Sequence, residues 1–61
     1  MTYGEMKREL KKNGCYFYQH GSRHEMWNNP KTGILFPVGR HDAKEIPKGT
    51  LDSIKKAAGL K

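Results

Sequence analysis

Residues 15–27 have the sequence CYFYQHGSRHEMW, and this stretch decides the fold of the chain. Aromatic side chains crowd residues 15–19, which suits the pleated surface of a β-strand better than a helix. Residues 24–27 alternate polar and apolar side chains, as a half-buried strand does. Because Gly21-Ser22 lies between the two runs and suits a tight connection, the stretch predicts an antiparallel hairpin whose turn carries His24.

A helix is expected before this hairpin and a third strand after it. Thr2 and Glu5 form a capping-box pattern, which starts a helix that Asn13-Gly14 then ends. Residues 34–38 have the apolar composition of a strand. Because Pro37 has no N–H to donate to a ladder, we expect this strand at an edge of the sheet or ending at a bulge.

A second helix is expected near the end of the chain. Thr50 is a candidate N-cap, and a start near Pro47 is the alternative, since proline is accepted in a first helical turn. Gly59 supplies the C-terminal glycine. The apolar stripe of this helix consists of Leu51, Ile54 and Ala58.

The expected order of elements is therefore α-β-β-β-α. A three-stranded antiparallel sheet with both helices on one face buries both helical stripes and leaves the other sheet face in water. This is an α+β fold, and double-stranded-RNA-binding domains use the same order. At this length, residues 1–61 are expected to form one domain with a small core, too small for a large buried cofactor.

The charge of the chain points to an anionic partner. Lys and Arg number 12 against six Asp and Glu, a formal net charge of +6. Basic small domains most often bind nucleic acid. A peptide of the membrane surface would have one strongly apolar helical face and little else, so a membrane partner is not expected. No apolar run is as long as a signal peptide core or a membrane span, so we expect a cytoplasmic protein.

Cysteine and histidine usage argues against a metal centre. Cys15 is the only cysteine, so an internal disulfide or a thiolate cluster is excluded. A small buried side chain is a better interpretation of Cys15 than a catalytic thiol, because the residue begins an apolar run. His20, His24 and His41 offer neither a helical pair nor a thiolate partner, so no metal ligands are expected.

Four short motifs occur together in the chain: KKNG at residues 11–14, GSRH at residues 21–24, FPV followed by Arg40-His41, and GTLDSIKKAAGL at residues 49–60. In this combination the chain resembles the HicA toxins, small ribonucleases of bacterial toxin–antitoxin pairs. The resemblance implies a fold like that of double-stranded-RNA-binding domains and cleavage of mRNA without a metal or cofactor. It also implies neutralisation by a HicB-like antitoxin encoded beside the toxin.

The resemblance maps the catalytic histidine onto His24. Residue chemistry alone favours a structural histidine in such a turn, and the resemblance reverses that preference. Imidazole suits proton transfer because its ordinary pKa, about 6.5, lies near neutral pH. Gly21, Ser22 and Arg23 are expected to support His24, with Ser22 shaping the turn and binding a phosphate.

The hairpin register decides which face His24 occupies. Many HicA toxins place the histidine directly after Gly-Ser, whereas one residue intervenes here, so two registers stay open. A two-residue Gly21-Ser22 loop sets His24 opposite Gln19 and on the face of Phe17. A three-residue loop sets His24 opposite His20, roughly 5 Å away at Cβ.

Further residues are candidates for RNA contact. His41, and after it His20, are candidates for the second proton-transfer group. Lys48 is expected to meet phosphate at the start of the second helix. The other helical lysines are expected to be mostly solvated; they are Lys7, Lys11, Lys12, Lys55 and Lys56.

Trp27 and Tyr18 are aromatic residues at strand positions, where core packing is the more frequent state than stacking on bases. Two other functions also stay open. One is a non-catalytic RNA-binding module of the same fold, and the other is a domain whose basic face docks an acidic protein.

Overall fold

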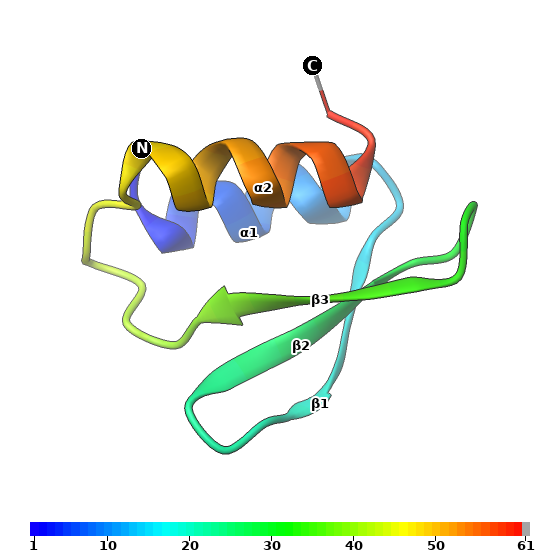
Figure 1. The fold of residues 1–61 in the computed structure, drawn as a ribbon, viewed down its shortest axis with the longest axis horizontal. Coiled ribbons are helices and arrows are strands. Elements are labelled where there is room, and N and C mark those ends of the chain that lie inside the picture. Colours follow the sequence, from blue (N-terminus) through cyan, green and yellow to red (C-terminus); the bar gives the residue numbers. More distant parts are fainter. Residues whose placement is uncertain (61) are drawn as a thin grey trace.

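The computed structural model describes residues 1–60. Its elements are α1 (Tyr3–Lys12), β1 (Tyr16–His20), β2 (His24–Asn29), β3 (Ile34–Gly39) and α2 (Lys48–Ala58). The strands form one antiparallel sheet in the order β1-β2-β3. Both helices lie over the same face of this sheet and leave the other face uncovered (Figure 1). The predicted α+β fold is confirmed.

The ends of α1 follow from local hydrogen bonds. The Thr2 hydroxyl accepts the Glu5 N–H at 3.2 Å, and the Glu5 carboxylate accepts the Thr2 N–H at 2.8 Å. The backbone bond from Thr2 and then its hydroxyl lower the pKa of Glu5. Gly14, with φ at 88°, follows the last turn in the left-handed conformation. Both predicted boundaries of this helix are confirmed.

The start of α2 corrects one prediction. Pro47 is the N-cap, and its carbonyl oxygen accepts the Leu51 N–H at 2.8 Å, so Thr50 lies inside the first turn. Proline with φ at −57° already has a helical value of this angle and lacks only an N–H that the first turn cannot use. The start near Pro47 is therefore right, and Gly59 ends the helix as predicted, with φ at 77°. Neither helix of residues 1–60 has the length and hydrophobicity to cross a membrane.

The core lies between the sheet and the two helices. Its buried hydrophobic residues come from every element except β1; they are Met6, Leu10, Cys15, Trp27, Phe36, Val38, Ile46, Ile54 and Ala58. Burial of Cys15 raises the pKa of its thiol and confirms the interpretation of this residue as a small buried side chain. The strand itself begins one residue later, at Tyr16.

The β1–β2 hairpin has neither of the two registers predicted for it. His20 pairs with Glu25, and the Gly21 N–H donates to the His24 carbonyl oxygen at 2.7 Å. The connecting residues are therefore Ser22-Arg23, so His24 lies opposite neither Gln19 nor His20.

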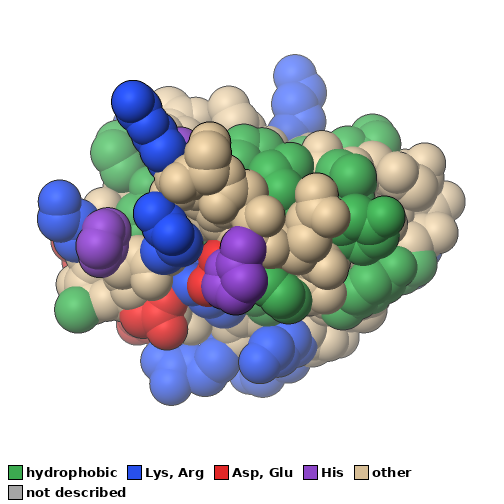
Figure 2. Space-filling model, turned by 90° about the horizontal axis from the view of Figure 1, so that it is seen from below, with side chains coloured by type: hydrophobic (Ala, Val, Ile, Leu, Met, Phe, Trp, Pro, Cys, Tyr) green, Lys and Arg blue, Asp and Glu red, His purple; other side chains and the backbone are tan. Residues whose placement is uncertain are grey.

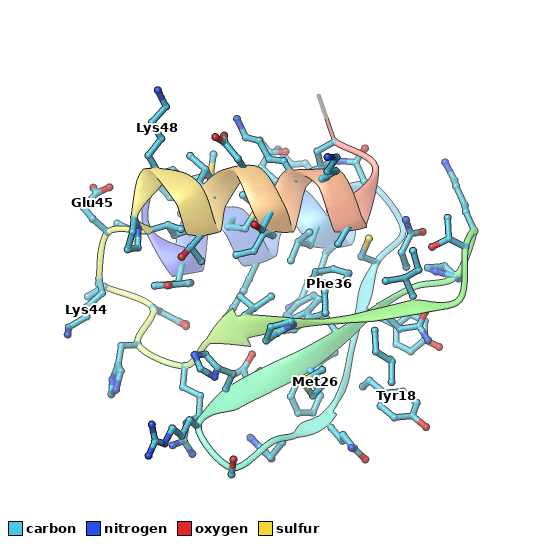
Figure 3. All side chains as sticks on the ribbon, in the orientation of Figure 1. Tyr18, Met26, Phe36, Lys44, Glu45 and Lys48 are labelled. Atoms are coloured by element: carbon cyan, nitrogen blue, oxygen red, sulfur yellow. The ribbon has the colours of Figure 1, made fainter. Side chains whose placement is uncertain are left out.

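A β-bulge in β1 changes which of its residues face the helices. Phe17 pairs with Trp27 but Gln19 pairs with Met26, so Tyr18 is the extra residue. The bulge turns Phe17 toward the helices, where Trp27 is buried, while Met26 lies on the uncovered face. Figure 3 shows Tyr18 and Met26 on the side of the sheet away from the helices, and Phe36 on the side that faces them. The prediction that His24 shares a face with Phe17 is wrong.

The edge position predicted for β3 is confirmed. β3 pairs with β2 alone, and Pro37 lies opposite Met26 with its side chain exposed. A proline is tolerated there because an edge strand has backbone groups that no neighbour needs.

Lys7 is buried, so the solvated position predicted for this lysine is wrong. Its side chain is 11% exposed, and its ammonium group pairs with Glu25 at 3.1 Å and with Asp42. Burial disfavours the charged form, but the hydrogen bonds to Asp42 and Glu25 outweigh burial and raise the pKa of Lys7. These ion pairs join α1 to β2 and to the loop after β3. Since the raised pKa belongs to a base, the contribution of charged Lys7 to stability is complete at neutral pH and is lost as the pH rises through that pKa.

Leu10→Ala should lower the free energy of unfolding by about 2–5 kcal/mol, because it leaves a cavity in a core of this size. Leu10 is fully buried, whereas Leu35 on the uncovered face is 42% exposed. Leu35→Ala is the matched control and should cost about 0.5 kcal/mol or less. Urea denaturation followed by the fluorescence of Trp27, the sole tryptophan, measures both changes. Equal losses would contradict a core confined to one face.

Candidate functional site

The β1–β2 turn and the end of β3 meet at one corner of the sheet. His24 begins β2 and pairs with Gly39, the last residue of β3. Arg40 follows directly, and its guanidinium group lies 3.5 Å from the Ser22 carbonyl oxygen. We call this region the hairpin corner; it consists of Ser22, Arg23, His24, Arg40 and His41, all of which are exposed.

The uncovered face has a charged end and an apolar end. Figure 2 shows Lys, Arg and His side chains toward one end of this face and hydrophobic side chains toward the other. The apolar end includes Tyr18, which is 51% exposed, so the core position predicted for this residue is wrong. The cause is the bulge, which places Tyr18 outside the regular alternation of β1. Trp27 is buried, as predicted.

Gly21 holds the turn by the absence of a side chain. A Cβ at this position would lie 2.8 Å from the His24 carbonyl oxygen, the same atom that accepts the Gly21 N–H. That distance is too short for a carbon atom beside an oxygen. The close approach of the two backbones, and with it the position of His24, therefore requires glycine at residue 21.

Gly39 supports His24 from the neighbouring strand. A Cβ at Gly39 would lie 2.8 Å from Cζ of Tyr3, so the tyrosine ring from α1 packs directly on this glycine. Because Gly39 is the register partner of His24, the contact from α1 stabilises the end of β3 that pairs with the histidine.

The structure brings some predicted site residues together and separates others. Gly21, Ser22, Arg23 and His24 form one turn, and His41 lies two residues beyond the register partner of His24. The others lie apart. His20 pairs with Glu25 on the face that the helices cover, and Lys48 begins α2 and points away from the sheet (Figure 3).

Arg40 is absent from the residues predicted for the site. Its guanidinium group reaches the turn because β3 runs antiparallel to β2 and ends beside it. The signal available in the sequence is its place directly after the third strand. That signal becomes useful only when the pairing of the strands is known.

The positive charge of the hairpin corner is unneutralised. Within residues 1–60 the ion pairs join the N-terminus to Glu45 and Lys7 to Glu25 and Asp42, and none involves Arg23 or Arg40. Two guanidinium groups and an exposed imidazole are therefore free to meet a phosphate. Among residues 1–60, no group of three His, Cys, Asp or Glu residues is placed to hold a metal ion.

Gly21→Ala should destabilise the hairpin, by about 1–3 kcal/mol, because its Cβ collides with the His24 carbonyl oxygen. Gly49→Ala is the matched control. Nothing lies within 4 Å of a Cβ at that position in α2, and alanine is the better helix former, so this variant should be unchanged or more stable. Urea denaturation and amide hydrogen exchange at residue 21 test the difference. Equal tolerance of both changes would show that the close approach does not constrain the turn.

Of the comparisons with known proteins, the one with family models found a match. A family model described as HicA toxin of bacterial toxin-antitoxin matches residues 3–60. Comparison with curated proteins and with solved structures gave no match. Since the matched region spans all five elements and the hairpin corner, the chain belongs to the HicA toxin family.

Proposed function

We propose that this chain is an endoribonuclease that cleaves mRNA, with His24 as its proton-transfer residue. The observation that carries the proposal is the exposed imidazole of His24 beside two arginines that no carboxylate neutralises. Family membership supports a toxin, the biological setting in which such an activity would act.

The chemistry needs little machinery because RNA carries its own nucleophile. The 2′ oxygen forms a bond to the adjacent phosphorus while the bond from phosphorus to the 5′ oxygen breaks, which leaves a cyclic phosphate and a 5′ hydroxyl. One group must take the proton of the 2′ hydroxyl, and another must give a proton to the leaving oxygen. His24 performs one of these transfers, and His41 is the first candidate for the other.

Arg23 and Arg40 have a different task in the proposed reaction. Negative charge builds on the phosphate oxygens as phosphorus gains its fifth bond, and fixed cations stabilise it most when they need not move. The contact of Arg40 with the Ser22 carbonyl oxygen holds one of them at the turn. Proton transfer and charge stabilisation by these residues require no metal ion in this scheme.

The chain also needs a neutralising partner. As a member of a toxin–antitoxin family, it is expected to act with an antitoxin, and we propose one of the HicB type. Masking the hairpin corner is a direct route to neutralisation, because every residue of the proposed machinery is exposed there.

His24→Ala should reduce RNA cleavage by about 10²–10⁴-fold, the usual contribution of general acid–base catalysis. The wild type should cleave RNA equally well in EDTA. Gln19→Ala is the control, since Gln19 is exposed and lies opposite Met26 on the same face without joining the corner. The control should cleave RNA as fast as the wild type. Gel analysis of RNA incubated with the wild type, His24→Ala or Gln19→Ala measures the cleavage by each. Intact RNA with the wild type, or full activity of His24→Ala, would overturn the proposal; binding without cleavage would identify an RNA-binding module.

Expression of the wild type should arrest bacterial growth, whereas His24→Ala should not, because the variant cleaves mRNA far more slowly. Co-expression of the antitoxin gene encoded beside this chain should restore growth. Growth curves and the amount of full-length mRNA measure both effects. Arrest by the His24→Ala variant, without loss of mRNA, would mean that toxicity arises from binding and not from cleavage.

A further inference from the structure

A groove of about 800 Å³ lies between α1 and the β1–β2 hairpin, on the face opposite to His24. The residues that matter for its chemistry are Lys7, Arg8, Lys11, Phe17, His20 and Glu25. Basic side chains come from α1, and the aromatic side chains come from β1. None of these residues belongs to the hairpin corner.

The charges within the groove are unequally matched. Lys7 is already paired with Glu25 and Asp42. Arg8 and Lys11 are exposed, three residues apart on one helical face, and neither has an ion pair within residues 1–60. Two adjacent cations on the α1 rim are thus available to an anionic ligand.

The opposite rim is aromatic. Phe17 is 40% exposed although it lies on the face covered by the helices. The centroid of its ring lies 5.0 Å from that of the His20 ring and 6.4 Å from that of the buried Trp27 ring, both in edge-to-face orientation. The Phe17 ring is therefore packed from two sides. Such a fixed, exposed ring offers a stacking platform, which every nucleobase can use.

We propose that this groove binds a nucleotide of single-stranded RNA, with the base against Phe17 and His20 and the phosphate against Arg8 and Lys11. Free cations facing an exposed aromatic ring favour this ligand over an acidic peptide, which would use the cations and leave the ring unused. A base in a duplex is stacked on its neighbours, so the ligand is single-stranded.

The inference rests on the proposed function in one respect, since it takes RNA as the ligand. His20 and Glu25 form the strand pair next to the Gly21–His24 pair that closes the turn. An RNA strand that crosses the hairpin therefore reaches the groove on one face and His24 on the other. The groove would hold nucleotides beside the cleaved bond and so contribute binding without touching the reacting atoms.

The test measures binding without cleavage, in the His24→Ala background, with a short fluorescent single-stranded RNA of mixed sequence. Arg8→Ser with Lys11→Ser should weaken binding about tenfold and reduce the slope of log affinity against log salt by about 0.7, the value for one phosphate contact on a single strand. Phe17→Leu should weaken binding about fivefold or more, with the salt slope unchanged.

Lys44→Ser with Lys56→Ser is the matched control, because it removes the same charge from exposed positions outside the groove. It should change affinity by less than about twofold. Equal losses in the two double variants, or unchanged affinity in the groove variants, would overturn the inference. Weaker antitoxin binding with unchanged RNA binding would also overturn it and assign the groove to a protein partner.

The proposed function is tested by a separate measurement, which is RNA cleavage by proteins that retain His24. Cleavage by the wild type together with normal RNA binding by the groove variants would leave the proposed function standing without this site. Selective loss of binding in the groove variants, with no cleavage by the wild type, would leave the site standing without the proposed activity.

Discussion

The structure depends on one constraint. A chain of 61 residues has enough apolar side chains to build a packed core on one face of the sheet. Within residues 1–60, all nine buried hydrophobic residues belong to one cluster between the sheet and the helices. Both helices lie on that side, where their buried residues pack against those of the sheet. The second face is left in water, and His24 is exposed there, next to the turn that Arg40 contacts.

Features set by local chemistry were predictable from the sequence, and those set by distant contacts were not. The capping box of Thr2 and Glu5 and the glycine after each helix need only neighbouring residues, so these boundaries are right. The hairpin register is different. It depends on a bulge at Tyr18, which is favoured by the packing of Phe17 against Trp27, ten residues along the chain. No pattern within the turn itself reveals such a bulge.

The same distinction explains what could be predicted about the candidate site. His24 stood out because its turn resembles that of a known family, but the turn does not show which face it serves. Arg40 joins the corner only through the pairing of β3 with β2, and Tyr3 only through its contact with Gly39. The burial of Lys7 was not predictable because its ion-pair partners, Glu25 and Asp42, lie far along the chain.

The residue after His24 links the core to the proposed chemistry. Glu25 accepts a hydrogen bond from the Trp27 indole at 3.1 Å and pairs with Lys7 on α1. Since adjacent strand residues point to opposite faces, anchoring Glu25 on the covered side fixes the backbone from which His24 projects on the open side. The ion pair between Lys7 and Glu25 thus anchors the strand next to His24, although the side chains of Lys7 and His24 lie on opposite faces of the sheet.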